Sequence, residues 1–155
     1  SGGNTGQVAY RTWNGTAWSN WWTLFNPGNI LGTVSQSGGV PTGAIIERGS
    51  NANGQYVRYA DGTQICHFYG TVTDQTINNA YVFGLFLGER TWTFPAQFAS
   101  GHIVAFHQGR WGSSVSWSTL AAVTTTTAEF RFIDANSRST GSNFVLNFAA
   151  IGRWF

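Results

Sequence analysis

The chain has few charged residues and no lysine. Of its 155 residues eight are basic and six are acidic, and all eight basic residues are arginines. The arginines are spread almost evenly along the sequence, so they form no basic stripe of the kind that follows a phosphate backbone. A net charge of +2 spread in this way argues against nucleic-acid binding.

Long apolar runs are also missing. No stretch reaches the roughly 18 consecutive apolar residues that a membrane-spanning helix needs, so we expect no membrane insertion. The chain does not open with a basic stretch followed by an apolar segment, so we expect no signal peptide. Methionine is absent. We therefore expect the chain to be a processed product or, by preference, an excised C-terminal piece of a longer protein.

Cysteine occurs once, as Cys66. A single cysteine forms no internal disulfide and has no partner for a cysteine-based metal site. The surrounding residues 64–68 have the composition of a strand, so we predict a buried, unreactive thiol that packs as a small hydrophobe. Activation by His67 is disfavoured because neighbouring strand residues point to opposite faces.

Catalytic motifs are missing as well. There is no nucleophile elbow, no phosphate-binding loop and no paired spacing of metal ligands, so we expect no enzymatic activity, no cofactor and no metal. Asp134 is the acidic residue that turn chemistry and basic neighbours explain least. A polysaccharide-cleaving site, which needs two carboxylates across a cleft, is therefore kept as an alternative.

Aromatic residues are abundant, with eight Trp, five Tyr and twelve Phe. Trp is large and seldom fully buried, so some of these rings must lie at a surface or at a subunit contact. Soluble proteins keep exposed rings mainly where they bind something. The abundance of rings thus indicates a binding or assembling protein.

The rest of the composition predicts an all-β fold. Thr, Val, Ile and aromatic residues dominate, and Gly and Asn interrupt them at short intervals. Asn14-Gly15 and Asp61-Gly62 are strong hairpin signals. They predict the strand pairs 8–13 with 18–25 and 54–59 with 63–72. Further strands are predicted over 44–47, 81–87, 91–94, 102–107, 114–120, 122–126, 128–134 and 143–155. Such a series favours an antiparallel β-sandwich with a small N-terminal β-hairpin module.

The sequence also suggests a division into domains. A polar, glycine-rich stretch over 27–42 has the composition of a linker. We divide the chain into a β module at 1–26, the linker at 27–42 and a β-sandwich at 43–155. Because chain ends are usually polar and frayed, the apolar end at Trp154 and Phe155 predicts packing into the core or against another subunit.

Four segments resemble parts of known fibre proteins. Residues 10–21 resemble the end of a pyocin-knob repeat, a module of bacteriophage tail fibres and of phage-tail-like bacteriocins. Residues 53–66 resemble the opening hairpin of C-terminal tail-fibre receptor-binding domains. A Phe-Pro-x-x-Phe segment follows at 92–98, and an aromatic closing strand at 148–154. The last two segments also resemble the H-type lectin fold, a six-stranded antiparallel sandwich that trimerises and binds sugars.

The resemblance implies a function as well as a fold. It implies a homotrimer at the tip of an extracellular virion fibre, with the rest of the fibre joined to its N-terminus. Its partner would be a bacterial surface polysaccharide or other glycan, which it attaches to without cleaving. The alternatives are a capsule-degrading spike enzyme and a purely structural fibre tip that trimerises a longer fibre.

Two segments have the chemistry of a sugar site. Proteins hold a sugar with an aromatic platform for its C–H face and with polar groups for its hydroxyls. Glycines predict a loop at 107–114, and 134–143 is a second polar loop; binding groups concentrate on loops. The predicted ligand-binding residues are His107, Arg110, Trp111, Trp117, Asp134, Asn136 and Arg138.

Some of these aromatic and polar residues have a simpler explanation. The Trp111 ring is equally compatible with folding back over a sheet edge, and Asn136 and Arg138 with an ordinary solvated turn. Three rings are assigned to the core, namely Trp92, Phe94 and Phe98. Four are assigned to the N-terminal module, with a second sugar site there as an alternative, namely Trp13, Trp18, Trp21 and Trp22.

Overall fold

The structure is a computed structural model, and it describes residues 8–99, 102–111, 116–141 and 143–155. In this described part of the chain the regular elements are β-strands and one short 3₁₀ turn, which confirms the predicted all-β fold. Contacts between residues divide the chain into two compact units. The first holds Ser1–Arg48 with Tyr59–Asp61, and the second holds Gly49–Arg58 with Gly62–Phe155.

The first unit begins with the hairpin predicted at Asn14-Gly15. Strands β1 (Val8–Tyr10) and β2 (Trp22–Leu24) pair antiparallel. Gly15 has a φ of 96°, a left-handed value that glycine adopts without steric cost. The Asn14 side-chain oxygen accepts hydrogen bonds from the amides of the second and third residues that follow it, at 2.9 and 2.8 Å. The turn is therefore stabilised by local chemistry, as the sequence predicted.

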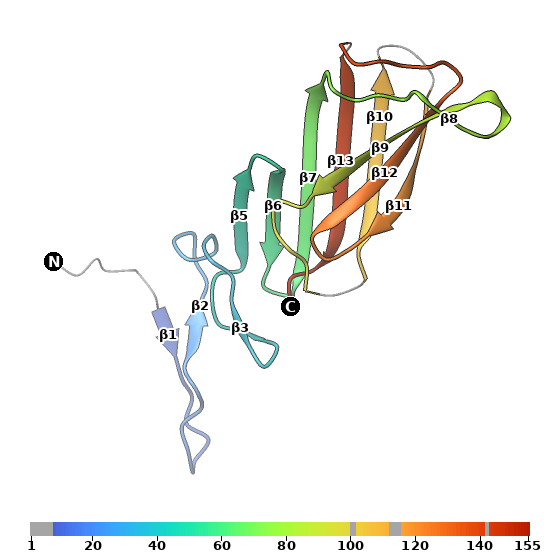
Figure 1. Ribbon diagram of the computed structural model, residues 1–155. Coiled ribbons are helices and arrows are strands. Elements are labelled where there is room, and N and C mark those ends of the chain that lie inside the picture. The colour runs from blue at the N-terminus through green and yellow to red at the C-terminus, as the bar shows by residue number, and fades with distance from the viewer. Residues whose placement is uncertain (1–7, 100–101, 112–115, 142) are drawn as a thin grey trace. The chain divides into compact units, whose positions relative to one another are not determined.

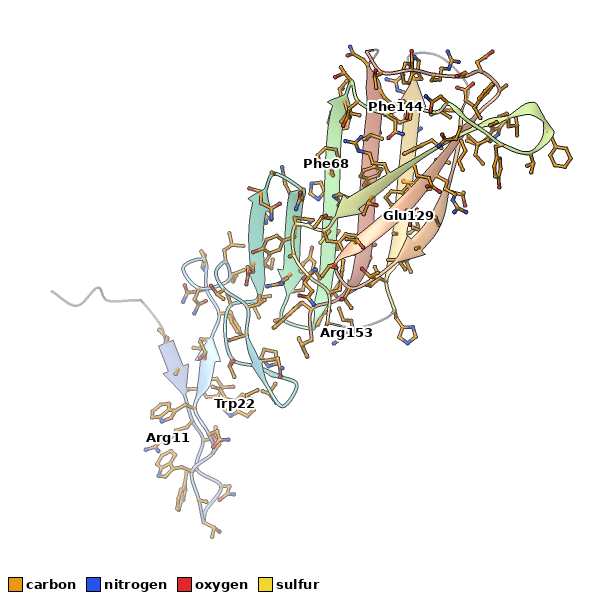
Figure 2. The ribbon with its side chains drawn as sticks, viewed as in Figure 1. Arg11, Trp22, Phe68, Glu129, Phe144 and Arg153 are labelled. Atoms are coloured by element: carbon orange, nitrogen blue, oxygen red, sulfur yellow. The ribbon has the colours of Figure 1, made fainter. Side chains whose placement is uncertain are left out.

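Aromatic rings cover this hairpin without forming a closed core (Figure 2). The Trp13 and Trp18 rings pack at 5.5 Å between centroids. The Arg11 guanidinium lies 4.5 Å from the Trp18 ring centroid and 4.8 Å from that of Trp21, within the range of cation–π attraction. All three rings, and that of Trp22, remain about half exposed or more. The hairpin therefore depends on stacking more than on burial.

The segment predicted as a linker contains structure of its own. Strands β3 (Gln36–Ser37) and β4 (Val40–Pro41) form a second small hairpin. Val34 is buried, and its amide donates to the Glu47 carboxylate at 3.0 Å. The division at 27–42 stays a prediction, and the contact units described above divide the chain at other positions.

The second unit is an antiparallel sandwich of two sheets, which Figure 1 shows face to face. The first sheet has the strand order β10-β13-β7-β6-β5, and the second has the order β11-β12-β9-β8. The strands of the first sheet are β5 (Ile46–Asn51), β6 (Gly54–Tyr59), β7 (Thr63–Val72), β10 (Val104–Trp111) and β13 (Phe144–Arg153). Those of the second are β8 (Asn79–Ala80), β9 (Phe86–Thr93), β11 (Trp117–Val123) and β12 (Thr127–Asp134).

The core lies between these two sheets. Alternate residues of β12 and β13 are buried, because successive side chains of a strand point to opposite faces. The Phe130 and Phe148 rings stack across the core at 4.7 Å between centroids. Figure 2 labels two further core rings, Phe68 and Phe144. Burial confirms the core assignment of Trp92, Phe94 and Phe98.

Cys66 and the chain end also lie in this unit. Cys66 is fully buried, as predicted, and burial raises the pKa of its thiol. The hairpin at Asp61-Gly62 forms as predicted, with Gly62 at a φ of 95°. Trp154 and Phe155 are half-buried and pack edge to face at 4.5 Å. The expected subunit contact at these two rings stays a prediction.

Two predicted strands are wrong between residues 81 and 94. One strand, β9 (Phe86–Thr93), replaces 81–87 and 91–94, and a 3₁₀ turn at Val82–Gly84 precedes it. Phe83 and Gly84 both have positive φ, at 59° and 76°. Regular strands have φ near −120 to −140°, so two consecutive residues with positive φ interrupt the extended conformation. The side chains at 81–87 favour a strand, so the sequence did not indicate the turn that the structure has there.

The predicted loop at 107–114 is also wrong in its described part. Residues 107–111 belong to β10, which pairs with β13 along its whole length. Gly109 lies where the Phe132 and Phe144 rings fill the space of a side chain. Glycine is present here for close packing and not for a turn. Residues 112–114 lie outside the described part of the chain.

Smaller shifts affect four other predicted strands. The strand predicted at 44–47 is β5 at Ile46–Asn51, and the one predicted at 102–107 begins at Val104. The strands predicted at 114–120 and 122–126 are the single strand β11, Trp117–Val123. A turn follows β11, and the Thr124 hydroxyl accepts hydrogen bonds from the amides of Thr126 and Thr127.

Candidate functional site

The structure distributes the predicted ligand-binding residues over both sheets and the turn that follows β12. His107, Arg110 and Trp111 lie on β10 of the first sheet, and Trp117 lies on β11 of the second. Asp134 ends β12, and Asn136 and Arg138 lie in the turn that follows. Within strand β10 the side chains also diverge, because Arg110 points outward while His107 and Trp111 point toward the core.

Asp134 and Arg138 form a buried ion pair. The Asp134 side chain is 1% exposed and that of Arg138 is 21% exposed, and Arg138 Nε donates to Asp134 Oδ2 at 3.1 Å. Asp134 Oδ1 accepts the amide of Asn136 at 2.8 Å. The backbones of Arg138 and Ile77 exchange two hydrogen bonds of 2.9 Å. These contacts attach the turn to the segment around Ile77 and give Asp134 and Arg138 a structural role, while Asn136 takes part through its backbone amide and its side chain is exposed.

The partly buried His107 ring packs against the core. It stacks on Phe130 at 4.3 Å, with 15° between the planes. Burial lowers the pKa of His107 and favours the neutral ring. Its Nε2 is buried and has no hydrogen-bond partner among the described residues. The Trp111 ring, half-buried, packs on Phe144 at 5.8 Å, so it lies back against the sandwich.

The outer surface of the first sheet carries an apolar patch, with His67, Gln108 and Asn147 as polar neighbours in the same strand rows. Strand register aligns four aliphatic residues in one row across β6, β7, β13 and β10. We call this surface the apolar face, and it consists of Val57, Ile65, Ile151 and Val104 with Phe106, Ala149 and Tyr69. Exposed fractions of 54% for Phe106 and 74% for Tyr69 show that water reaches much of it in the single chain. Arg110 lies at its margin, opposite Val145.

The outer surface of the second sheet combines one large ring with charged groups. Trp117 is 55% exposed and lies opposite Ile133 of β12. Two residues along β12, Arg131 donates from Nε to Glu89 Oε1 at 2.8 Å, and both side chains are nearly half exposed. The Glu89 carboxylate holds the pKa of Arg131 above its ordinary value. Residues two apart across a strand pair lie about 7–8 Å from each other, so the Trp117 ring is within reach of this ion pair.

We call this second surface the Trp117 face, defined by Trp117, Thr119, Arg131, Glu89 and Glu129. Figure 2 labels Glu129 on it. Sequence reasoning found Trp117 but missed Arg131 and Glu89. The alternation of charged Glu129 and Arg131 with buried Phe130 and Phe132 was the available signal for an outward polar row.

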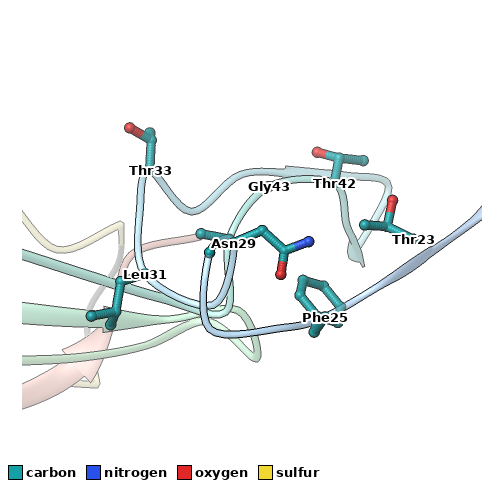
Figure 3. A pocket seen from close by; sticks show the side chains of 9 residues that line it. Thr23, Phe25, Asn29, Leu31, Thr33, Thr42 and Gly43 are labelled. Atoms are coloured by element: carbon teal, nitrogen blue, oxygen red, sulfur yellow. The ribbon is translucent and has the colours of Figure 1, made fainter. Parts of the chain in front are cut away.

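The first unit contains a pocket of about 450 Å³ (Figure 3). The Phe25 ring and the Asn29 amide lie at its wall. The polar atoms of Asn29 are already engaged, because Oδ1 accepts the Asn26 amide at 2.7 Å and Nδ2 donates to the Leu24 carbonyl at 2.9 Å. The lining residues include no titratable side chain, so the pocket offers no acid–base chemistry.

The described residues contain no group of three or more His, Cys, Asp or Glu side chains placed to hold a metal ion. Over the same residues, no helix has the length and apolar character needed to cross a membrane.

Comparison with known proteins gives one weak structural likeness. No protein-family model matches the chain, and no curated protein matches it. Among solved structures, the chain is similar to a fragment of the P. aeruginosa R1 pyocin fibre comprising C-terminal residues 323–701. The TM-score is 0.44 and the sequence identity 15%. The match covers 96% of this chain and 52% of the fragment, so the chain spans about half the fragment's length.

Proposed function

We propose that the chain is the receptor-binding part of a phage tail fibre, or of a related phage-tail-like particle. In this role it attaches to a bacterial surface glycan at the extracellular tip of the virion and does not cleave it. The ordered resemblance of four segments to fibre modules, together with the antiparallel sandwich, supports the fibre assignment. The Trp117 face supports the assignment of glycan binding, and it is the observation on which this proposal rests.

The Trp117 face has the two kinds of group that a sugar needs. The half-exposed indole of Trp117 offers a flat apolar surface for the C–H face of a pyranose ring. The ion pair of Arg131 and Glu89 uses Nε and Oε1, and the other guanidinium nitrogens and the second carboxylate oxygen suit sugar hydroxyls. A non-enzymatic role is favoured because Asp134, the residue behind the polysaccharide-cleaving alternative, is buried in an ion pair with Arg138.

The apolar face supports the homotrimer. Phe106 and Tyr69 each expose roughly 100–150 Å², since an aromatic side chain buries about 150–250 Å² in total. With the aliphatic row, the area approaches half of the about 1,000 Å² that a specific interface needs in total. This face carries no acidic residue, and a second copy of the chain can cover it without burying an unpaired carboxylate. We assign it to the contact between subunits.

Ile151→Asp tests the trimer. Ile151 is 43% exposed, so the carboxylate stays solvated in a separate chain but is buried in the proposed interface. We expect light scattering to show a trimer for the wild type at micromolar concentration and a folded monomer for the variant. A wild-type monomer, or an unchanged trimer in Ile151→Asp, contradicts the assignment.

Trp117→Ala tests the glycan site. We expect a loss of about tenfold or more in affinity for host surface polysaccharide, as found when a stacking ring is removed. Arg131→Ala should weaken binding similarly, while both variants keep the wild-type melting temperature within about 3 °C because the residues are exposed.

Trp22→Ala is the matched control, since Trp22 is 54% exposed and Trp117 is 55% exposed. It should bind the glycan normally. A loss in this control alone would instead locate the sugar at the N-terminal hairpin. If the wild type binds no glycan, the result supports the alternative of a purely structural fibre tip. If the wild type releases reducing ends from the polysaccharide, the result supports the alternative of a capsule-degrading enzyme.

A further inference from the structure

The turn between β8 and β9 holds an exposed phenylalanine in an unfavourable backbone conformation. Phe83 has φ 59° and ψ 27°, and among the described non-glycine residues it is the one with positive φ. Its side chain is 97% exposed, the highest value among the exposed large hydrophobic residues. The left-handed region is disfavoured for a side chain such as Phe, and exposure of the ring to water adds a second cost. Folding of the sandwich explains neither feature.

The turn is nevertheless well defined. The Tyr81 amide donates to the Leu85 carbonyl at 2.8 Å, and the Leu85 amide donates to the Val82 carbonyl at 3.2 Å. Gly84, with a φ of 76°, allows the chain to return to β9. In Figure 1 this turn projects away from the two sheets beside the β8 label. The Phe83 ring is therefore presented at the end of a closed, hydrogen-bonded projection.

The chemistry of this tip restricts what it can bind. Residues 75–88 contain no charged side chain. Val82, Phe83 and Gly84 have no polar side-chain atom, so the tip offers no hydrogen bond to sugar hydroxyls. Val82 is 53% exposed and Tyr81, at the base of the turn, is 41% exposed. The tip thus presents an apolar end with an amphipathic ring behind it.

We propose that this turn inserts Val82 and Phe83 shallowly into the surface layer of a lipid bilayer, with Tyr81 at the level of the headgroups. Two apolar side chains are too small for a protein–protein interface, which needs about 600–800 Å² on each partner. Insertion into a bilayer needs no interface of that size, because each buried side chain contributes separately, and two side chains give weak, reversible partitioning. Tyrosine is enriched at the membrane–water interface.

This inference goes beyond the proposed glycan binding and does not depend on it. It also differs from the sequence expectation of no membrane insertion. That expectation rested on the absence of a spanning run, which does not address a projecting turn. A short apolar turn becomes visible only when its backbone conformation and exposure are known.

Vesicle flotation with the full chain tests the proposal. The probe is a vesicle of phosphatidylcholine alone, which has no glycan and no net charge, so flotation reports on the turn and not on the Trp117 face. The variants are Phe83→Gly and Phe83→Asn, since Gly and Asn tolerate the left-handed conformation better than Phe does. Trp117→Ala is the control: it should float like the wild type while losing glycan affinity.

We expect the wild type to float and each Phe83 variant to lose about tenfold to hundredfold in partitioning, the factor that corresponds to burial of one Phe side chain. Their melting temperatures should be unchanged or raised, because relief of the left-handed strain offsets the greater freedom of the unfolded chain. Absence of wild-type flotation, or equal flotation of the variants, overturns the proposal. If the Phe83 variants melt about 5 °C or more below the wild type, Phe83 stabilises the fold by packing, and the proposal is overturned. A change of oligomeric state in the variants would show that a second copy covers the tip.

Discussion

Asp134 is the residue for which the sequence and the structure give opposite expectations. The sequence marked it as a ligand-binding residue or a catalytic acid. In the structure it is 1% exposed and binds Arg138 and the Asn136 amide. We predict that Asp134→Ala lowers the stability of the fold and has no direct effect on the glycan site.

The contacts of Asp134 set the size of this effect. Hydrogen bonds to a charged partner contribute about 1.5–3 kcal/mol, and a bond to a backbone amide contributes about 1 kcal/mol. Arg138 is 21% exposed, so its guanidinium recovers some hydration after the substitution, and the loss stays below the 3–5 kcal/mol of a fully buried pair. We estimate about 2–4 kcal/mol for Asp134→Ala. Asp134→Asn should cost less, about 1–2 kcal/mol, because its amide oxygen still accepts the Asn136 amide.

Thermal unfolding with a double-mutant cycle measures this effect. At about 2–4 °C for each kcal/mol in a chain of this size, Asp134→Ala should lower the melting temperature by about 4–16 °C. Arg138→Ala combined with Asp134→Ala should show a coupling energy of about 1–3 kcal/mol. If both single variants melt within about 1 °C of the wild type and lose glycan binding, the reasoning is refuted and the turn is a binding site.

Two other buried groups give further predictions. Because burial lowers the folded-state pKa of His107, the unfolded chain binds a proton more readily, so stability should be constant above about pH 6.5 and fall as the pH drops below it. Denaturant titrations at several pH values should show this fall in the free energy of unfolding. The fall should persist in His67→Asn, which removes an exposed histidine, and should vanish in His107→Phe. Cys66 should not react with a thiol reagent at neutral pH until the protein is unfolded, since it is fully buried and its pKa is raised; rapid reaction of the native protein contradicts this.

Local chemistry explains which parts of the fold were predictable. Asn14-Gly15 and Asp61-Gly62 formed the predicted hairpins, because the required positive φ is a property of those residues themselves. The burial of Phe130 was predictable from alternation along its strand. Errors arose where a residue serves a distant contact: Gly109 suggested a loop but makes room for rings of other strands. Phe83 suggested a strand because its side chain favours one.

The candidate site was less predictable than the fold. Glu89 and Arg131 are 42 positions apart, and the pairing of β9 with β12 brings them together. Neither residue is unusual in its own segment, so no local pattern identifies the pair. Conversely, Asp134 and Arg138 have the composition of a binding loop, and only their burial shows that they bind each other.

The sequence by itself determined the all-β class, the two glycine-containing hairpins, the buried thiol and three of the core rings, Trp92, Phe94 and Phe98, because these depend on residues close together in the chain. Only the tertiary structure decided which aromatic rings remain exposed to partners. In the folded chain, Trp111 packs on Phe144 and Trp117 lies on an outer face near the ion pair of Arg131 and Glu89. Phe83 is exposed at a turn. The physical reason is that exposure depends on which strands pair and which face each sheet buries, and those choices are made by contacts between distant segments.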